Sequence, residues 1–113
     1  MPRKNALTAS PPLPVAEAIK GLGTRLKAAR LARNLTMKEV AQRIGTGPRA
    51  VSDAEAGKPG ASASVLVALL WLYDLLGAFH QLADPATDQI AQSNLRHRER
   101  ARRGKKGELD NDF

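Results

Sequence analysis

Glycine and proline residues divide residues 35–57 into two short segments, and this spacing constrains the fold more than any other feature of the chain. Thr36 and Glu39 have the spacing of a capping box, in which each side chain satisfies a backbone N–H at the start of a helix. The pattern therefore predicts a short helix that begins at Met37. Gly45 is expected to end this helix, because glycine adopts a left-handed backbone at little cost.

A second short helix is expected directly after the first. Pro48 suits the first helical position, where its missing N–H costs nothing, and Gly57 is expected to close the helix. Helical spacing puts five apolar residues and one glutamate of the two helices on inward faces: Val40, Ala41, Ile44, Val51, Ala54 and Glu55. The second helix then presents outward Arg49, Ala50, Ser52 and Asp53. Two short helices joined by a tight turn are typical of a helix-turn-helix, although any small helical hairpin could share these features.

Charge and size bound the classes of partner. The chain has 113 residues, enough for one domain plus tails, and carries 18 Lys and Arg against 11 Asp and Glu, a net charge of +7. This balance favours a polyanionic partner, either nucleic acid or an anionic membrane surface. The sequence contains no Cys, which excludes disulfides and thiolate metal sites and permits a reducing cytoplasm. We therefore expect a cytoplasmic protein.

Catalysis and membrane insertion are not supported by the sequence. His80 and His97 are the only histidines, and no catalytic or metal-ligand spacing surrounds them, so we expect no enzyme, cofactor or metal. The most apolar run, residues 65–73, is far shorter than the roughly 20 residues that cross a bilayer. No secretory signal is visible at the N-terminus.

The chain divides into three predicted parts, and the central one shows no strand-like alternation. Residues 1–15 are rich in proline and carry Arg3 and Lys4, a composition that resists helix formation and favours a flexible arm, which could touch a DNA minor groove. Residues 16–84 form the predicted all-α domain, and residues 85–113 a polar tail. The first helix of the domain is striped by Leu22, Leu26 and Ala29, with Leu35 just beyond. Its start is left open by Gly21 and Gly23, so the run from Val15 to Lys20 could be a separate turn.

The next expected helix is apolar on nearly every side. Ser62 or Ser64 can cap it, and it contains Val65, Leu66, Leu69, Leu70 and Tyr73. Such a helix must be covered on more than one side, so Val67, Trp71 and Leu75 are expected to face either a fifth helix or a second copy of the chain. Trp71 fits core filling and a dimer contact equally well. The fifth helix is predicted to carry Leu76, Phe79 and Leu82 and to end at Asp84–Pro85.

The tail combines a basic run with an acidic end. Residues 96–106 hold seven cations and one acid, a composition usual for a solvated or disordered tail. Even a disordered basic tail adds sequence-independent affinity for phosphates. The chain then ends in an acidic stretch with a terminal Phe113, which could insert into a groove on a protein partner.

The residues from Leu22 to about Leu82 resemble the lambda-repressor-like, Xre-type helix-turn-helix family. The resemblance rests on Arg30, Leu35-Thr36, Glu39-Val40-Ala41, Ile44-Gly45, Val51-Ser52, Glu55 and Gly57. It implies a compact five-helix domain with flexible basic tails, in which the second and third helices form the DNA-binding pair. It also implies an ion pair between Arg30 and Glu55 that orients the recognition helix. Two positions depart from the family pattern: Met37 stands where Gln is frequent, and Gly47 where Ser or Thr is.

The resemblance assigns DNA contacts to particular residues. Base contacts fall on the outward N-terminal part of the recognition helix: Pro48, Arg49, Ser52 and Asp53. Arg49 suits guanine, because its guanidinium can reach O6 and N7 together, whereas Asp53 could accept from cytosine or orient Arg49. Phosphate contacts are expected at the starts of the two helices and on the first of them: Thr36, Lys38, Arg43 and Gly47.

From Gly57 onward the chain resembles the HipB-type branch of that family, the antitoxins encoded beside HipA-like serine/threonine kinase toxins. The likeness rests on the apolar positions after Gly57, on Asp84–Pro85 and on the composition of the tail. It implies a homodimeric repressor, associated with the nucleoid, that binds a palindromic operator, regulates its own operon and restrains a HipA-like kinase through tail residues Leu109 and Phe113. The alternative is a stand-alone Xre-type or phage-type regulator without a toxin partner.

Overall fold

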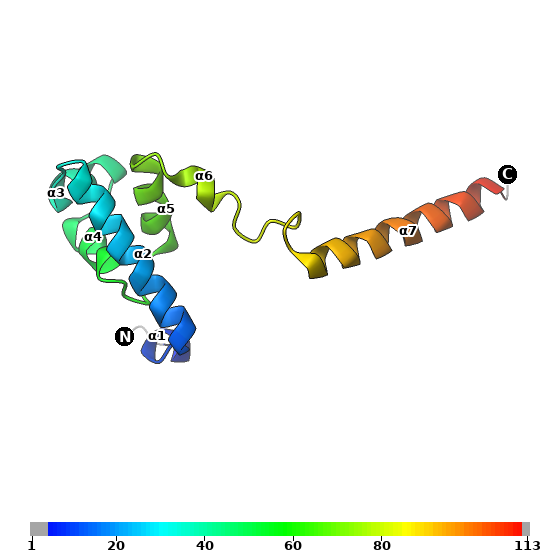
Figure 1. The fold of residues 1–113 in the computed structure, drawn as a ribbon, viewed down its shortest axis with the longest axis horizontal. Helices are drawn as coiled ribbons and strands as arrows, with labels where there is room; N and C mark the ends of the chain where they lie inside the picture. Colours follow the sequence, from blue (N-terminus) through cyan, green and yellow to red (C-terminus); the bar gives the residue numbers. More distant parts are fainter. Residues whose placement is uncertain (1–4, 112–113) are drawn as a thin grey trace. The chain divides into compact units, whose positions relative to one another are not determined.

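The computed structural model describes residues 5–111, with side chains described as far as Gly104. Every regular element in this range is a helix: α1 (Ala6–Ala9), α2 (Leu13–Ala32), α3 (Met37–Ile44), α4 (Pro48–Glu55), α5 (Ala63–Leu72), α6 (Leu76–Phe79) and α7 (Gln89–Asn111) (Figure 1). The chain divides into two compact units, an N-terminal unit that ends at Phe79 and a C-terminal unit that begins at His80. The all-α prediction is confirmed, and the predicted domain contains the five helices expected, α2–α6. α1 and α7 lie in the segments predicted to be a flexible arm and a tail.

The proline-rich start of the chain is more helical than its composition predicts. Asn5 caps α1 by accepting a hydrogen bond of 2.8 Å from the Thr8 N–H. α2 begins at Leu13 and continues unbroken through both glycines that left its start open. The expectation that residues 1–15 resist helix is therefore wrong for these segments, because Pro14 lies in the first turn of α2, where no hydrogen bond needs its N–H. Arg3 and Lys4 lie outside the described residues.

The predicted capping box opens α3 at Met37. The Glu39 N–H donates to Thr36 Oγ1 at 3.1 Å, and the Thr36 N–H donates to Glu39 Oε1 at 3.2 Å. These hydrogen bonds with Thr36 lower the pKa of Glu39, so its contribution to folding is lost as the pH falls through that lowered pKa. Gly45 follows α3 with φ +85° and ψ +36°, the predicted left-handed end. The turn Gly45–Gly47 then leads directly into α4.

The core of the N-terminal unit lies among α2, α3, α4 and α5, which pack on one another (Figure 1). The inward faces predicted for the two short helices are confirmed, with Ile44 only partly buried. The fully buried apolar side chains are Leu26, Val40, Ala41, Val51, Ala54, Leu69 and Tyr73. Leu22, Ala29 and Leu35 are partly buried against this core, so the predicted stripe of the first helix faces inward.

Two glycines set the close approach of α2 to the end of α4. A Cβ on Gly23 would lie 2.6 Å from the Ala54 carbonyl oxygen and 2.7 Å from that of Glu55. A Cβ on Gly57, whose φ is +68°, would lie 2.5 Å from Cα of Lys20. Both contacts are with backbone, which cannot rotate away. The two helices can therefore pack at this distance only with glycine at these positions.

α5 starts as predicted, but the helix that follows it is shorter than expected. Ser62 supplies the cap by accepting from the Ser64 N–H at 3.2 Å. Tyr73 is the residue that ends α5 rather than part of it. The prediction of a fifth helix that reaches Asp84 is wrong, because α6 ends at Phe79. Leu82 is exposed and gains no packing that would stabilise a longer helix, and Ala83 has φ +56°.

The C-terminal unit contains a long helix where the sequence indicated a solvated or disordered tail. Asp88 caps the start of α7, since its Oδ1 accepts from the N–H groups of Ile90 and Ala91 at 3.0 and 3.2 Å. The residues that follow include many Arg, Ala and Gln, which favour helix strongly. The expectation overlooked this propensity because it considered charge alone.

Two alanine substitutions in α2 test the role of the close approach. We expect Gly23→Ala to lower the free energy of unfolding by about 1–3 kcal/mol, because α2 and α4 must separate. Gly21→Ala is the matched control: its Cβ would meet only the flexible end of Arg25, at 3.1 Å, so the higher helix propensity of alanine should stabilise by up to about 1 kcal/mol. Urea unfolding followed by circular dichroism measures both. Equal effects of the two substitutions would contradict the packing argument.

Candidate nucleic-acid interface

α4 presents one free face beside a tight turn. Its inward residues are buried against α2, α3 and α5, while Pro48, Arg49 and Ser52 are exposed. Ala50 and Asp53 are half-buried at the edge of this face. The side chains predicted to contact bases thus lie together on the first turns of one short helix. This arrangement leaves the N-terminal half of α4 accessible to a large partner.

The orientation of α4 is fixed at its other end by a buried ion pair. Arg30, near the end of α2, donates from Nε to Glu55 Oε2 at 2.7 Å and from Nη2 to Glu55 Oε1 at 3.0 Å. The two residues are only 7% and 8% exposed. The structure thus contains the pair that the resemblance implied, in a bidentate geometry that fixes both distance and direction.

The same arginine reaches a third element. Arg30 Nη1 donates to the Leu35 carbonyl oxygen at 2.9 Å, just before α3 begins. Arg30 therefore connects the end of α2, the entry to α3 and the last residue of α4. The hydrogen bond with Glu55 raises the pKa of Arg30, so the guanidinium stays charged despite its burial.

Asp53 has a partner that the sequence analysis did not assign. Its Oδ1 lies 3.0 Å from Lys58 Nζ, and the Lys58 N–H donates to the Asp53 carbonyl oxygen at 3.1 Å. The side chain of Lys58 is 57% exposed. This pair places a cation beside the acid on the free face of α4, which reduces the repulsion that an unpaired carboxylate would exert on phosphates. A spacing of five residues across a helix end gave no sequence signal for it.

The residues predicted to contact phosphates lie at the helix starts and along α3. Lys38 and Arg43 are exposed on α3. The Thr36 oxygen is engaged in the capping box, which leaves its hydroxyl hydrogen free to donate. Gly47 precedes α4 with an extended backbone and provides no side-chain cap, so the cap at this helix start is left to the backbone, as its departure from the family pattern indicated.

A second arginine, missed by the sequence analysis, joins α2 to the end of α5. Arg33 Nη2 donates to the Tyr73 carbonyl oxygen at 2.8 Å, and the guanidinium carbon lies 5.3 Å from the centre of the Tyr73 ring. Burial raises the pKa of the Tyr73 hydroxyl, whose oxygen has no hydrogen-bond partner among the described residues. An arginine directly after a helix is too common to signal this contact from sequence.

The residues predicted to face a fifth helix or a second copy border an uncovered apolar surface. Val67 is half-buried, Leu75 is exposed and Trp71 is 61% exposed. A shallow groove on this side of the N-terminal unit, here called the α5 groove, is lined by Ala63, Ser64, Val67, Ala68, Trp71 and Leu76. Trp71 is therefore not a core residue of the single chain. Of the two roles expected for it, core filling is excluded, and a contact with a second copy stays a prediction.

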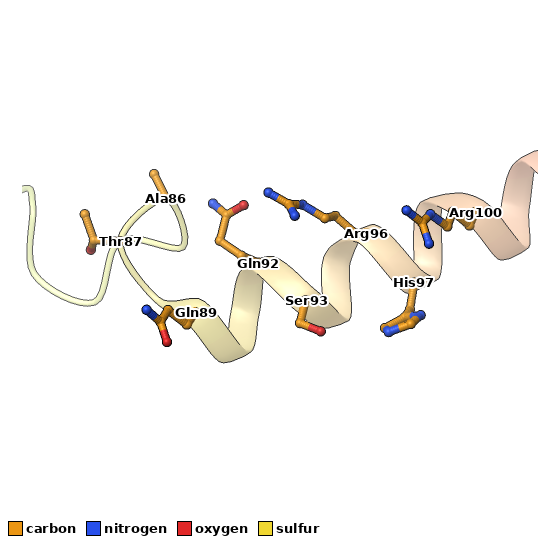
Figure 2. Close-up of a pocket in the computed structure, with 8 residues that line it drawn as sticks. All are labelled: Ala86, Thr87, Gln89, Gln92, Ser93, Arg96, His97 and Arg100. Atoms are coloured by element: carbon orange, nitrogen blue, oxygen red, sulfur yellow. The ribbon is translucent and has the colours of Figure 1, made fainter.

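The predicted tail contacts lie at the limit of the described residues. Leu109 falls within α7, but its side chain is not among those described, and Phe113 lies outside the described range. A shallow groove on α7 and the turn before it is lined by Ala86, Thr87, Gln89, Gln92, Ser93, Arg96, His97 and Arg100 (Figure 2). The two arginines that line the groove, Arg96 and Arg100, lie along the same side of the helix as Gln92.

Neither a bilayer-spanning helix nor a metal-binding cluster is present in the described part of the chain. None of its helices combines the length and the apolar character that crossing a membrane requires. Its His, Asp and Glu side chains form no group of three or more that could hold a metal ion.

Comparison with known protein families identifies the helix-turn-helix part of the chain. The family model described as "Helix-turn-helix domain" matches residues 21–82, just over half of the chain. The matched range extends from α2 to just beyond α6 and includes the α3–turn–α4 segment and the ion pair. Neither the curated proteins nor the solved structures provide a significant match.

Removing one partner of the buried ion pair should be far more harmful than removing an exposed one. We expect Glu55→Gln to lower the free energy of unfolding by about 3–5 kcal/mol, because it leaves the Arg30 charge buried without a counter-charge. Lys58→Gln breaks the exposed pair with Asp53 and should cost less than about 1 kcal/mol. Urea unfolding near neutral pH measures both. A similar small loss in the two variants would show that the buried pair does not hold α4 in place.

Proposed function

The chain belongs to the helix-turn-helix domain family and is a DNA-binding regulator of that class, and on this premise we propose that it is a sequence-specific transcriptional repressor that binds its operator as a homodimer. The observation that carries the proposal is the free N-terminal face of α4, with Glu55 at the far end of the helix fixed by Arg30. A recognition helix must enter the major groove in one orientation. Fixing its distal end supplies that orientation and leaves the reading end accessible.

Base recognition is proposed for the exposed first turns of α4. Arg49 is the only cation in this helix, and a guanidinium can donate to O6 and N7 of guanine together. Ser52, one turn further along, can donate to or accept from a base edge. Pro48 offers an apolar contact at the helix start. The Asp53 carboxylate is paired with Lys58. It is proposed to accept a hydrogen bond from the cytosine amino group only where Lys58 leaves this pair and turns toward a phosphate.

Phosphate contacts are proposed to fix the register of α4 on the duplex. Lys38 and Arg43 supply charge from α3, and the hydroxyl of Thr36 can donate at the start of the same helix. The backbone N–H of Gly47, just before α4, offers a further donor near a helix start, where phosphates bind well. These contacts carry no sequence information and would support binding to any duplex.

A second copy of the chain is the proposed cover for the α5 groove. α5 is apolar on nearly all sides, yet only Leu69 is fully buried within it. Val67, Trp71 and Leu75 leave apolar area in water that a two-fold related copy would remove. A dimer would place two α4 helices on one face of DNA and would read a palindrome with half-sites about one helical turn apart.

A narrower form of the proposal concerns the biological setting. The resemblance of residues 57–88 and of the tail composition to HipB-type antitoxins supports a repressor that regulates its own operon and binds a HipA-like kinase. Leu109 and Phe113 are the proposed contacts with the kinase. The alternative is a stand-alone regulator of the Xre or phage type, which needs neither the kinase nor these tail residues.

Two substitutions separate DNA reading from dimerisation. After sites are selected from a random duplex library, we expect Arg49→Ala to weaken binding to the selected site about 5- to 150-fold, the equivalent of one lost bidentate base contact, while the protein stays dimeric. Trp71→Ala should shift the mass measured by light scattering from dimer to monomer. Arg25→Ala, on the exposed side of α2, is the control for the loss of one cation. Wild-type affinity of Arg49→Ala would contradict the assignment of α4 as the reading helix.

Co-purification from the native host tests the antitoxin setting. The full chain, treated with nuclease, should retain a kinase-like protein, and a chain that ends at Glu108 should lose it while still binding DNA. Recovery of the chain alone, as a dimer that binds its upstream DNA, would favour the stand-alone regulator.

A further inference from the structure

The five arginines on the described part of α7 surround the helix rather than lying on one side. Arg96, Arg100 and Arg103 share one face, because they are four and three residues apart. Arg98 and Arg102 lie about 200° around the axis from the first set, given 3.6 residues per turn. All five are exposed, and Glu99 is the single acid among residues 96–104. Figure 2 shows Arg96 and Arg100 aligned with Gln92 along one side of α7.

This distribution excludes the usual modes of helix docking on proteins and membranes. A helix that inserts into a protein groove needs apolar residues at positions i, i+3, i+4 and i+7, and a helix that lies on a membrane needs an apolar face. Between Arg96 and Gly104 the only apolar side chain is Ala101. The segment therefore has no face that a protein groove or acyl chains would cover.

The charge density of this segment matches that of a nucleic-acid duplex. Arg96 and Arg103 are separated by about 10 Å along the helix axis, at 1.5 Å per residue. Duplex DNA carries about six phosphates over the same length. Five arginines around one helix can thus meet phosphates on both walls of a groove, and the major groove is wide enough to admit a helix.

Repulsion within α7 also favours a polyanionic partner. Arg96 and Arg100, like Arg98 and Arg102, are like charges four residues apart, a spacing that destabilises a free helix. Glu99 lies three or four residues from Arg96, Arg102 and Arg103 and offsets part of this repulsion. The Asp88 cap fixes the start of α7 but cannot offset repulsion two turns away. Phosphates along the helix would remove this penalty.

We propose that α7 is a second DNA-contacting element, a helix that enters a groove of the duplex and binds its backbone without reading sequence. The inference rests on the proposed function, because it assigns α7 to the same DNA that α4 reads. The nine residues His80–Asp88 tether α7 to the helix-turn-helix unit. Binding by one element therefore raises the local concentration of the other at the DNA.

The salt dependence of binding to a scrambled 40-base-pair duplex tests the proposal with the full chain. Each lost phosphate contact lowers the slope of log K against log salt by about 0.9. Arg96→Gln with Arg100→Gln and Arg103→Gln should therefore lower it by about 2–3, and Arg98→Gln with Arg102→Gln by about 1–2. Glutamine keeps the helix propensity and removes the like-charge repulsion, so the helical circular dichroism signal should not fall.

Two matched controls accompany these variants. Replacing Arg96, Arg100 and Arg103 with lysine keeps the charge and should preserve the slope. Replacing Lys20, Arg25 and Lys27 with glutamine removes the same charge from exposed positions on α2 and should also preserve it.

Wild-type slopes for either α7 glutamine variant overturn the proposal, since a helix in a groove uses both faces. Loss of binding to phosphatidylserine vesicles with an unchanged DNA slope would likewise overturn it and assign a membrane surface. If the wild-type chain binds neither scrambled nor selected DNA, the proposed function itself fails. If the wild-type chain binds both kinds of DNA and the α7 variants keep its salt slope, only the inference about α7 fails.

Discussion

The buried pair of Arg30 and Glu55 is the interaction on which the rest of the N-terminal unit depends. One guanidinium satisfies both oxygens of a carboxylate on α4 and a carbonyl oxygen before α3, so three segments share a single polar centre. A charge buried this deeply is tolerated only when its partners are all in place. Small shifts of α4 are therefore resisted by geometry as well as by apolar packing, and Gly23 and Gly57 set the closeness at which the geometry holds.

The sequence was most informative where local chemistry decides structure. The capping box at Thr36, the left-handed Gly45 and the start of α4 at Pro48 follow from interactions within four residues, and each is confirmed. The buried pair lay beyond local rules, because its partners are 25 residues apart; it was anticipated through the resemblance alone. Within the candidate site, the outward face of α4 is the one part that the helical spacing of the sequence predicted directly.

Some features could not be predicted because they depend on contacts between distant segments. The length of α6 depends on whether Leu82 finds a packing partner, and Arg33 and Lys58 depend on which groups the folded chain brings near them. At both ends of the chain, composition was weighted above position and propensity. Pro14 is harmless in a first turn, and an arginine-rich segment with a good cap forms a helix despite its charge.

Because Glu55 is fixed at one end of α4 and the residues proposed to read bases lie at the other, folding and the proposed recognition depend on different side chains of the same helix. Residues 49 and 52 contribute little to the core, so their replacement should change the preferred sequence at small cost in stability. The fold can thus acquire new targets through a few exposed positions while its interior stays constant. In this two-turn helix, the exposed positions are free to change, whereas the buried positions are constrained by packing and by the ion pair.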